Sequence, residues 1–303
     1  MSAVSARHQL KKGTVGKWLL SFVRFVVIFG LAFIIIKPFI YKTLMAFMSP
    51  DDLLDSTVHL VARNPSLYYW QRAWEGLNLS QTLPNTLFLS LGVAVIQVLS
   101  CTMIGYGLAR FRFLGNKILS AAVIVIILVP YHVISIAQYL GFVYFGIGNF
   151  TINLVDTFWP MLILAFTGLG IKEGLYIYLL QQFFRSIPLA LEEAAYIDGA
   201  GTIRTFFQVM LPNARTMMMT VFLFSFCWQW TDSTYSSIYF NELPVFANTI
   251  ESFYIRVGLN ADMLGTNITR NAMAILIIIP LLVLFGFGQK LLVKSITLSG
   301  MAN

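Results

Sequence analysis

The sequence predicts an all-α, polytopic membrane bundle of six transmembrane helices with a helical hairpin on its cytoplasmic side. Three observations predict it: the composition, six long apolar runs, and an uneven distribution of basic residues. Of 303 residues, 58% are hydrophobic and only 11% are charged, whereas an ordinary soluble domain has about 25% charged residues. Because a globular surface must be covered with polar groups, this composition excludes a soluble domain.

Each apolar run is long enough to cross about 30 Å of hydrocarbon, which takes roughly 20 residues. The predicted spans are residues 18–41, 84–109, 117–139, 155–181, 214–232 and 272–293. They divide the chain into an N-terminal cytoplasmic segment with the first span and first outer loop (1–83), a core of five spans (84–293) that contains the loop 182–213, and a cytoplasmic C-terminal tail (294–303).

An even number of spans puts both termini on one side of the membrane, and lysines and arginines mark the cytoplasmic side. Thirteen of the 20 basic residues fall in the N-terminal and loop segments on one side, against six on the other. Both termini are therefore predicted to be cytoplasmic. The net charge of +7 follows from this topology and does not indicate a nucleic-acid partner.

The N-terminus also allows a cleaved signal peptide, because a basic stretch leads into an apolar one. The long basic region, Arg24 at its junction and the lack of a small-x-small site near Lys37-Pro38 favour a retained span. The first outer loop, 42–83, carries aromatic residues typical of interfacial anchoring; they are Tyr68, Tyr69, Trp70 and Trp74.

The chain has neither a metal-site nor an enzyme pattern. Cys101 and Cys227 lie in apolar stretches and are interpreted as packing residues. None of the three histidines has a second ligand at i+3 or i+4, so no metal is expected. A Gly-x-x-x-x-Gly-Lys-Ser/Thr phosphate loop is absent from the sequence, so ATP is not bound here by that motif.

The loop 182–213 contains residues typical of helix starts and ends, and their order predicts a helix, a turn and a second helix. Pro188 suits a first helical turn, and the glycines 199 and 201 end that helix. Thr202 is a plausible N-cap of the second helix, which Leu211-Pro212 ends before the fifth span. Two short helices outside the membrane are predicted, and an amphipathic hairpin on the bilayer surface is the alternative.

This loop contains Glu193-Ala194-Ala195, then Gly199, then Met210-Leu211-Pro212. The pattern resembles the signature of the integral-membrane subunits of bacterial ABC importers. The wider stretch QQFFRSIPLALEEAAYIDGAG (181–201) is similar to the carbohydrate branch, and within it to the maltose-type second permease subunit. The run Cys227-Trp228-Gln229-Trp230-Thr231-Asp232 departs from the Trp-Asn and Pro-Leu pairs that many relatives have after the fifth helix. The resemblance therefore does not extend to the details of the outer gate and the substrate contacts.

The resemblance implies a transport subunit, not an enzyme, in a bacterial cytoplasmic membrane. It implies a coupling helix seated on a dimer of a separate ATPase subunit, which would hold the ATP and magnesium, a second permease subunit, and an extracytoplasmic sugar-binding protein. A heterodimer of permeases is expected and a homodimer stays open. The residues implied in ATPase coupling are Glu192, Glu193, Ala194, Ala195, Asp198, Gly199, Leu211 and Pro212.

Charged residues inside spans are costly and suggest function, which singles out Lys172 and Glu173 in the fourth span. They point about 100° apart on a helix. They line a water-filled path, or they mark a helix interruption near the glycines 168, 170 and 174. Sugar sites favour aromatic faces with polar acceptors, although most membrane aromatics pack or anchor. The pathway candidates are Tyr131, His132, Gln138, Trp159, Lys172, Glu173, Trp228, Trp230 and Asp232.

The outer loop 233–271 has no predicted span. The resemblance implies that it probes the binding protein, and a re-entrant lid is the alternative. Rival functions are an ABC importer for another solute class, an ion-coupled secondary carrier and an intramembrane enzyme. No inverted repeat of the kind such carriers have, and no His/Asp/Glu cluster at membrane depth, is evident in the sequence.

Overall fold

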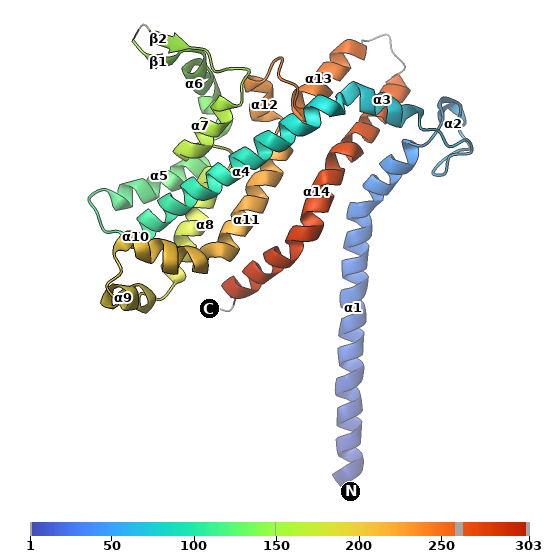
Figure 1. The fold of residues 1–303 in the computed structure, drawn as a ribbon. Coiled ribbons are helices and arrows are strands. Elements are labelled where there is room, and N and C mark those ends of the chain that lie inside the picture. Colours follow the sequence, from blue (N-terminus) through green and yellow to red (C-terminus); the bar gives the residue numbers. More distant parts are fainter. Residues whose placement is uncertain (1, 149, 258–262, 301–303) are drawn as a thin grey trace. The chain divides into compact units, whose positions relative to one another are not determined.

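A computed structural model describes residues 2–148, 150–257 and 263–300 (Figure 1). It is mostly helical, as predicted, and forms two compact units. The first unit holds residues 1–74 and 257–276, and the second holds 75–256 and 277–303. The division 1–83, 84–293 and 294–303 stays a prediction. Part of the predicted outer loop (258–262) and the end of the tail (301–303) lie outside the described residues.

The first unit contains α1 (Ser2–Met45), α2 (Pro50–Leu54), most of α3 (Tyr68–Leu77) and the start of α14 (Met263–Gly300). The apolar part of α1, Lys17–Met45, is long enough to cross a membrane and is exposed along its apolar length. After it, Asp55 accepts hydrogen bonds from the hydroxyl and amide of Thr57 and pairs with Arg63 at 2.9 Å. These hydrogen bonds and the nearby guanidinium lower the pKa of Asp55.

The second unit is built around α4 (Leu79–Arg110), which packs against three later helices. They are α7 (Trp159–Thr167), α8 (Glu173–Ser186) and α11 (Leu211–Trp230). Gly105 lets α4 approach α8 closely, since a Cβ there would lie 2.9 Å from Leu180. The core between these helices is apolar and aromatic, with Tyr176, Leu180 and Phe184 fully buried.

Four described helices are long and apolar enough to span a membrane. A fifth span exists if α5 (Asn116–Leu128) and α6 (Tyr131–Val143) count as one, but they are bent by 103°. The predicted span 117–139 is therefore not one continuous helix. Pro130 stands between the two helices, and the residue before a proline is driven out of helical geometry, which explains the break.

The predicted span 155–181 is also interrupted. Helix α7 ends at Thr167 and α8 begins at Glu173. Between them Gly168 (φ +82°) and Lys172 (φ +58°) adopt left-handed backbone conformations, which cannot continue a right-handed helix. Neither helix alone is long enough to be counted, so this fourth predicted span stays a prediction.

The segment after α8 holds α9 (Ala190–Ile197) and α10 (Thr202–Thr205), which continues through the π-helix η1 (Phe206–Met210) into α11. Two details of the predicted hairpin are wrong: Gly201, not Thr202, occupies the N-cap, and Leu211-Pro212 does not end a helix. The Leu211 amide bonds to the Phe206 carbonyl, the wider i→i+5 spacing of a π-bulge, and Pro212 follows without a break.

The opposite end of the second unit carries short elements that were not predicted (Figure 1). They are the antiparallel hairpin β1 (Phe145–Ile147) and β2 (Phe150–Ile152), α12 (Thr234–Tyr239) and α13 (Phe246–Val257). The second unit therefore has α9 at one end and these elements at the other, with α4, α8 and α11 between them.

Candidate coupling and transport sites

Helix α9 presents one face outward. Glu193 and Ala194 are exposed, and Ile197, one turn after Glu193, is 86% exposed. Residues four apart lie on the same helix face, so Glu193 and Ile197 form an acidic and apolar surface together. Ala195 is half-buried and Asp198 is exposed at the end of the helix.

A left-handed glycine ends α9. Gly199 has φ +80°, and the Ala200 amide donates to the Ala195 carbonyl at 2.9 Å. Together with the bond from the Gly199 amide to the Tyr196 carbonyl at 3.0 Å, this is the Schellman type of helix ending, in which glycine avoids the Cβ penalty of the left-handed conformation. No atom lies within 4 Å of the position a Cβ would take, so the backbone conformation and not crowding requires glycine here.

Glu192 points the other way from Glu193. Its carboxylate faces the end of α4, where Oε1 lies 3.5 Å from Nε of Arg110. Both side chains are buried, with 8% and 7% of their surface exposed. Glu192 is therefore an internal ion-pair partner, although the sequence placed it beside Glu193 in the coupling set.

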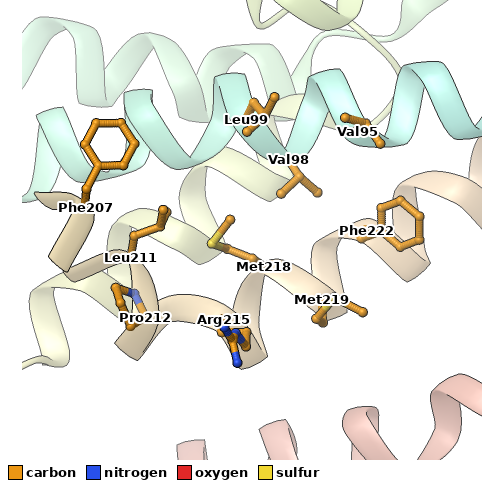
Figure 2. Close-up of a pocket in the computed structure, with 10 residues that line it drawn as sticks. All are labelled: Val95, Val98, Leu99, Phe207, Leu211, Pro212, Arg215, Met218, Met219 and Phe222. Carbon is orange, nitrogen blue, oxygen red and sulfur yellow. The ribbon is translucent and has the colours of Figure 1, made fainter. Parts of the chain in front are cut away.

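Leu211 and Pro212 line an apolar groove of about 430 Å³ between α4 and α11. Figure 2 shows the α4 side chains Val95 and Val98 above α11, with Arg215 near the end where α11 begins. The two residues of the Leu-Pro pair thus contribute to this groove and not to the exposed face of α9, and their part in coupling stays a prediction.

A second cavity, of about 480 Å³, lies between the α5–α6 bend and the α7–α8 interruption. It brings together Tyr131, Lys172 and Glu173 with Tyr235, which the sequence analysis missed. The rings of Tyr131 and Tyr235 stack with centroids 3.7 Å apart. The Lys172 ammonium lies 4.9 Å from the centre of the Trp228 ring, a cation–π contact that joins a fourth predicted residue to the cluster.

The Glu173 carboxylate is turned into the bundle and is fully buried. Its Oε2 accepts the Gly170 amide at 2.6 Å, and its Oε1 accepts the Ser100 hydroxyl at 2.9 Å. Buried polar groups need such partners, and here the carboxylate satisfies a backbone amide that the helix interruption leaves free. The sequence allowed two interpretations of Glu173, a residue that lines a water-filled path or one that marks a helix interruption. These hydrogen bonds fit the helix interruption.

Further polar contacts extend this network across three helices. Gln97 donates to the Ile171 carbonyl at 3.2 Å and accepts the Ser225 hydroxyl of α11. Ser100 also donates to the Ala165 carbonyl at 2.8 Å. Gln97 and Ser100 were missed by the sequence analysis, although two polar residues three apart within an apolar span indicate one buried polar face.

The remaining candidates lie apart from this cavity's lining. Trp230 is buried and donates from Nε1 to the Ile277 carbonyl at 3.0 Å. Asp232 accepts the amides of Tyr235 and Ser236 at the start of α12. His132 and Trp159 are exposed, and Gln138 is half-buried.

Asp156 organises the end of the unit opposite α9, and sequence analysis missed it as well. One carboxylate oxygen accepts the consecutive amides of Asn241, Glu242 and Leu243 at 2.9–3.0 Å. Asp156 itself has φ +66°, a conformation that aspartate tolerates better than most residues. No local pattern marks it, because its partners lie more than 80 residues later.

Residues 101–298 match the sequence model of a protein family, described as binding-protein-dependent transport system inner membrane component. The chain belongs to this family of transport components. Within it, the chain is 28% identical to the galactooligosaccharides transport system permease protein GanQ of Bacillus subtilis, over 89% of this chain and 91% of that protein.

A second relative and a solved structure are also similar to this chain. The chain is 27% identical to the maltodextrin transport system permease protein MalD of Streptococcus pneumoniae, over 91% of this chain and 93% of that protein. A crystal structure of a bacterial ABC transporter involved in the import of the acidic polysaccharide alginate matches the fold. Its TM-score is 0.73 at 18% identity, with 91% of this chain and 97% of that chain covered.

Proposed function

We propose that this chain is the permease subunit of an ATP-driven carbohydrate importer, a multi-pass protein of the bacterial cytoplasmic membrane. Family membership over residues 101–298 carries the proposal, and the oligosaccharide permeases among its relatives support carbohydrate as the solute. In this proposal α7 and α8 together form the fourth of six spans, and both termini are cytoplasmic.

The exposed face of α9 is the proposed contact for a separate ATPase subunit. Glu193 offers an acceptor to a basic side chain, while Ala194 allows close approach and Ile197 adds apolar contact area. ATP and magnesium are bound by the ATPase dimer, and this chain contributes no catalytic residue. ATP-driven closure of that dimer displaces α9 and biases the bundle between two states.

The cavity between the α5–α6 bend and the α7–α8 interruption is the proposed part of the sugar pathway. Its aromatic faces, Tyr131 and Tyr235, suit stacking against sugar rings, and the Lys172 ammonium supplies hydrogen-bond donors for hydroxyl groups. Glu173 also lines the cavity, and its carboxylate serves the local structure through the Gly170 amide. The pathway is completed by a second permease subunit in a heterodimer, and lipid covers exposed apolar surface such as that of α1.

The test is purification of the tagged chain from its native membrane in mild detergent, followed by mass spectrometry. We expect an ATPase subunit and a second permease to co-purify, and the reconstituted complex to import a maltooligosaccharide or galactooligosaccharide when ATP and an extracytoplasmic binding protein are present. Recovery of the chain alone, still moving solute into liposomes without ATP, would overturn the proposal.

A further inference from the structure

One guanidinium holds both ends of the short connection between α8 and α9. Arg110, the last residue of α4, donates from Nη2 to the Ile187 carbonyl at 2.6 Å and pairs through Nε with Glu192 at 3.5 Å. Ile187 is the C-cap of α8, and Glu192 lies in the first turn of α9. Arg110 therefore ties the start of α9 to the end of α4.

We infer that Arg110 and Glu192 are a positioning pair through which a displacement of α9 reaches α4. This inference rests on the proposed function, because it assigns the pair a part in coupling to the ATPase. Neither residue touches solute or ATP in this account. Their role is to make the docking helix and the central helix of the bundle move together.

The burial of the pair makes the link specific. With less than a tenth of either side chain exposed, removing one partner leaves the other as an unpaired buried charge, whereas removing both charges together is far milder. The guanidinium also lies at the carbonyl end of α4, where the helix dipole favours a positive charge. Reversing either charge would place two like charges against each other in this buried site, and the start of α9 would lose its contact with α4.

Aromatic packing at the same end of α4 makes the joint stiff. Tyr106, one turn before Arg110, packs edge-on against Phe184 of α8 at 5.4 Å and against Phe206 of η1 at 4.8 Å between ring centroids. Asn116 donates to the carbonyls of Leu108 and Phe111 and so closes the end of α4. The end of α4 is therefore packed on both sides of the ion pair.

Along α4 the same helix reaches the cavity wall. Ser100 lies ten residues before Arg110, about 15 Å along the helix, and donates to Ala165 of α7 and to Glu173. Gln97 holds the Ile171 carbonyl, next to Lys172 in the cavity lining. A movement of the α4 end thus acts on the α7–α8 interruption through described hydrogen bonds.

A structural anchor and a coupling link predict different results for the ratio of solute imported to ATP hydrolysed. The test uses the complete transporter with its native partners in proteoliposomes, with R110E, E192R and the double variant R110E/E192R. We expect each single variant to keep ATP hydrolysis but to lower uptake per ATP by at least about 10-fold, within the usual range of coupling between sites. The double variant, which restores opposite charges, should recover most of that loss.

R112E is the matched control, since Arg112 is exposed two residues away, and it should leave uptake per ATP unchanged. Wild-type uptake per ATP in both single variants, or a double variant no better than the singles, would overturn the inference. If the single variants do not assemble, R110M/E192L removes both charges together; wild-type uptake per ATP in that variant would also overturn it. Failure of the proposed function is distinguishable, because the wild-type complex would then show no ATP-dependent uptake.

Discussion

The second unit contains two pairs of charged residues that are neighbours in sequence, and in each pair one side chain is buried and the other is exposed. At the α7–α8 interruption Glu173 is buried against backbone and side-chain donors, while Lys172 is exposed beside the cavity. In α9 Glu192 is buried against Arg110, while Glu193 is exposed. Neighbours on a helix such as Glu192 and Glu193 point about 100° apart, and at the interruption the left-handed backbone of Lys172 separates the two side chains. In each pair one residue holds the local structure and the other faces a partner or a path.

The largest effect is expected at the exposed member in α9. Glu193→Lys reverses the charge offered to the ATPase, so uptake by the reconstituted complex should fall by at least about 10-fold. The melting temperature should stay unchanged, because the side chain is exposed. Glu75→Lys, an exposed acid outside α9, is the control. Normal uptake by the Glu193 variant would show that this face of α9 does not contact the ATPase subunit.

The buried member at the interruption should act mainly on stability. Glu173→Ala leaves the Gly170 amide without its acceptor, at about 1–3 kcal/mol for such an unsatisfied group, while the Ser100 hydroxyl keeps the Ala165 carbonyl. Glu173→Gln keeps one acceptor oxygen and should lose less. Thermal unfolding of the detergent-purified protein measures both, and equal melting temperatures for Ala and wild type would show that the carboxylate does not hold the interruption.

At the exposed member beside the cavity the expected effect is several-fold. Lys172→Met removes the donors and the cation–π contact with Trp228, worth about 0.5–1 kcal/mol at an exposed site, and should slow uptake without changing assembly. Lys117→Met, an exposed lysine in the first turn of α5, is the matched control. Identical uptake in the two variants would show that the Lys172 side chain does not contribute to the solute path.

The smallest effect concerns the backbone that ends α9. Gly199→Ala places a Cβ in a left-handed conformation, at roughly 1 kcal/mol, while Gly201→Ala should be neutral because Gly201 has φ −76°. Unfolding midpoints of the two variants give the comparison. Gly170→Ala sharpens it at the interruption, since a Cβ there would lie 2.6 Å from Gln97 and 2.7 Å from Glu173 and should destabilise more than either.

Long apolar helices were predictable from the sequence because their signal is local. The run 84–109 corresponds to α4, Leu79–Arg110, and Glu193-Ala194-Ala195 was found by its spacing. The direction in which Glu192 points was not predictable, because Arg110 lies far earlier in the chain. The polar network of Gln97 likewise depends on a contact between distant segments.

The most direct test of the paired arrangement is site-specific photo-crosslinking in native membranes, with the crosslinking residue placed at 193 and, separately, at 192. The account predicts a covalent adduct with the ATPase subunit from position 193 and none from position 192. An adduct from position 192 alone, or equal adducts from both positions, would contradict the assignment of Glu193 to the partner and of Glu192 to Arg110.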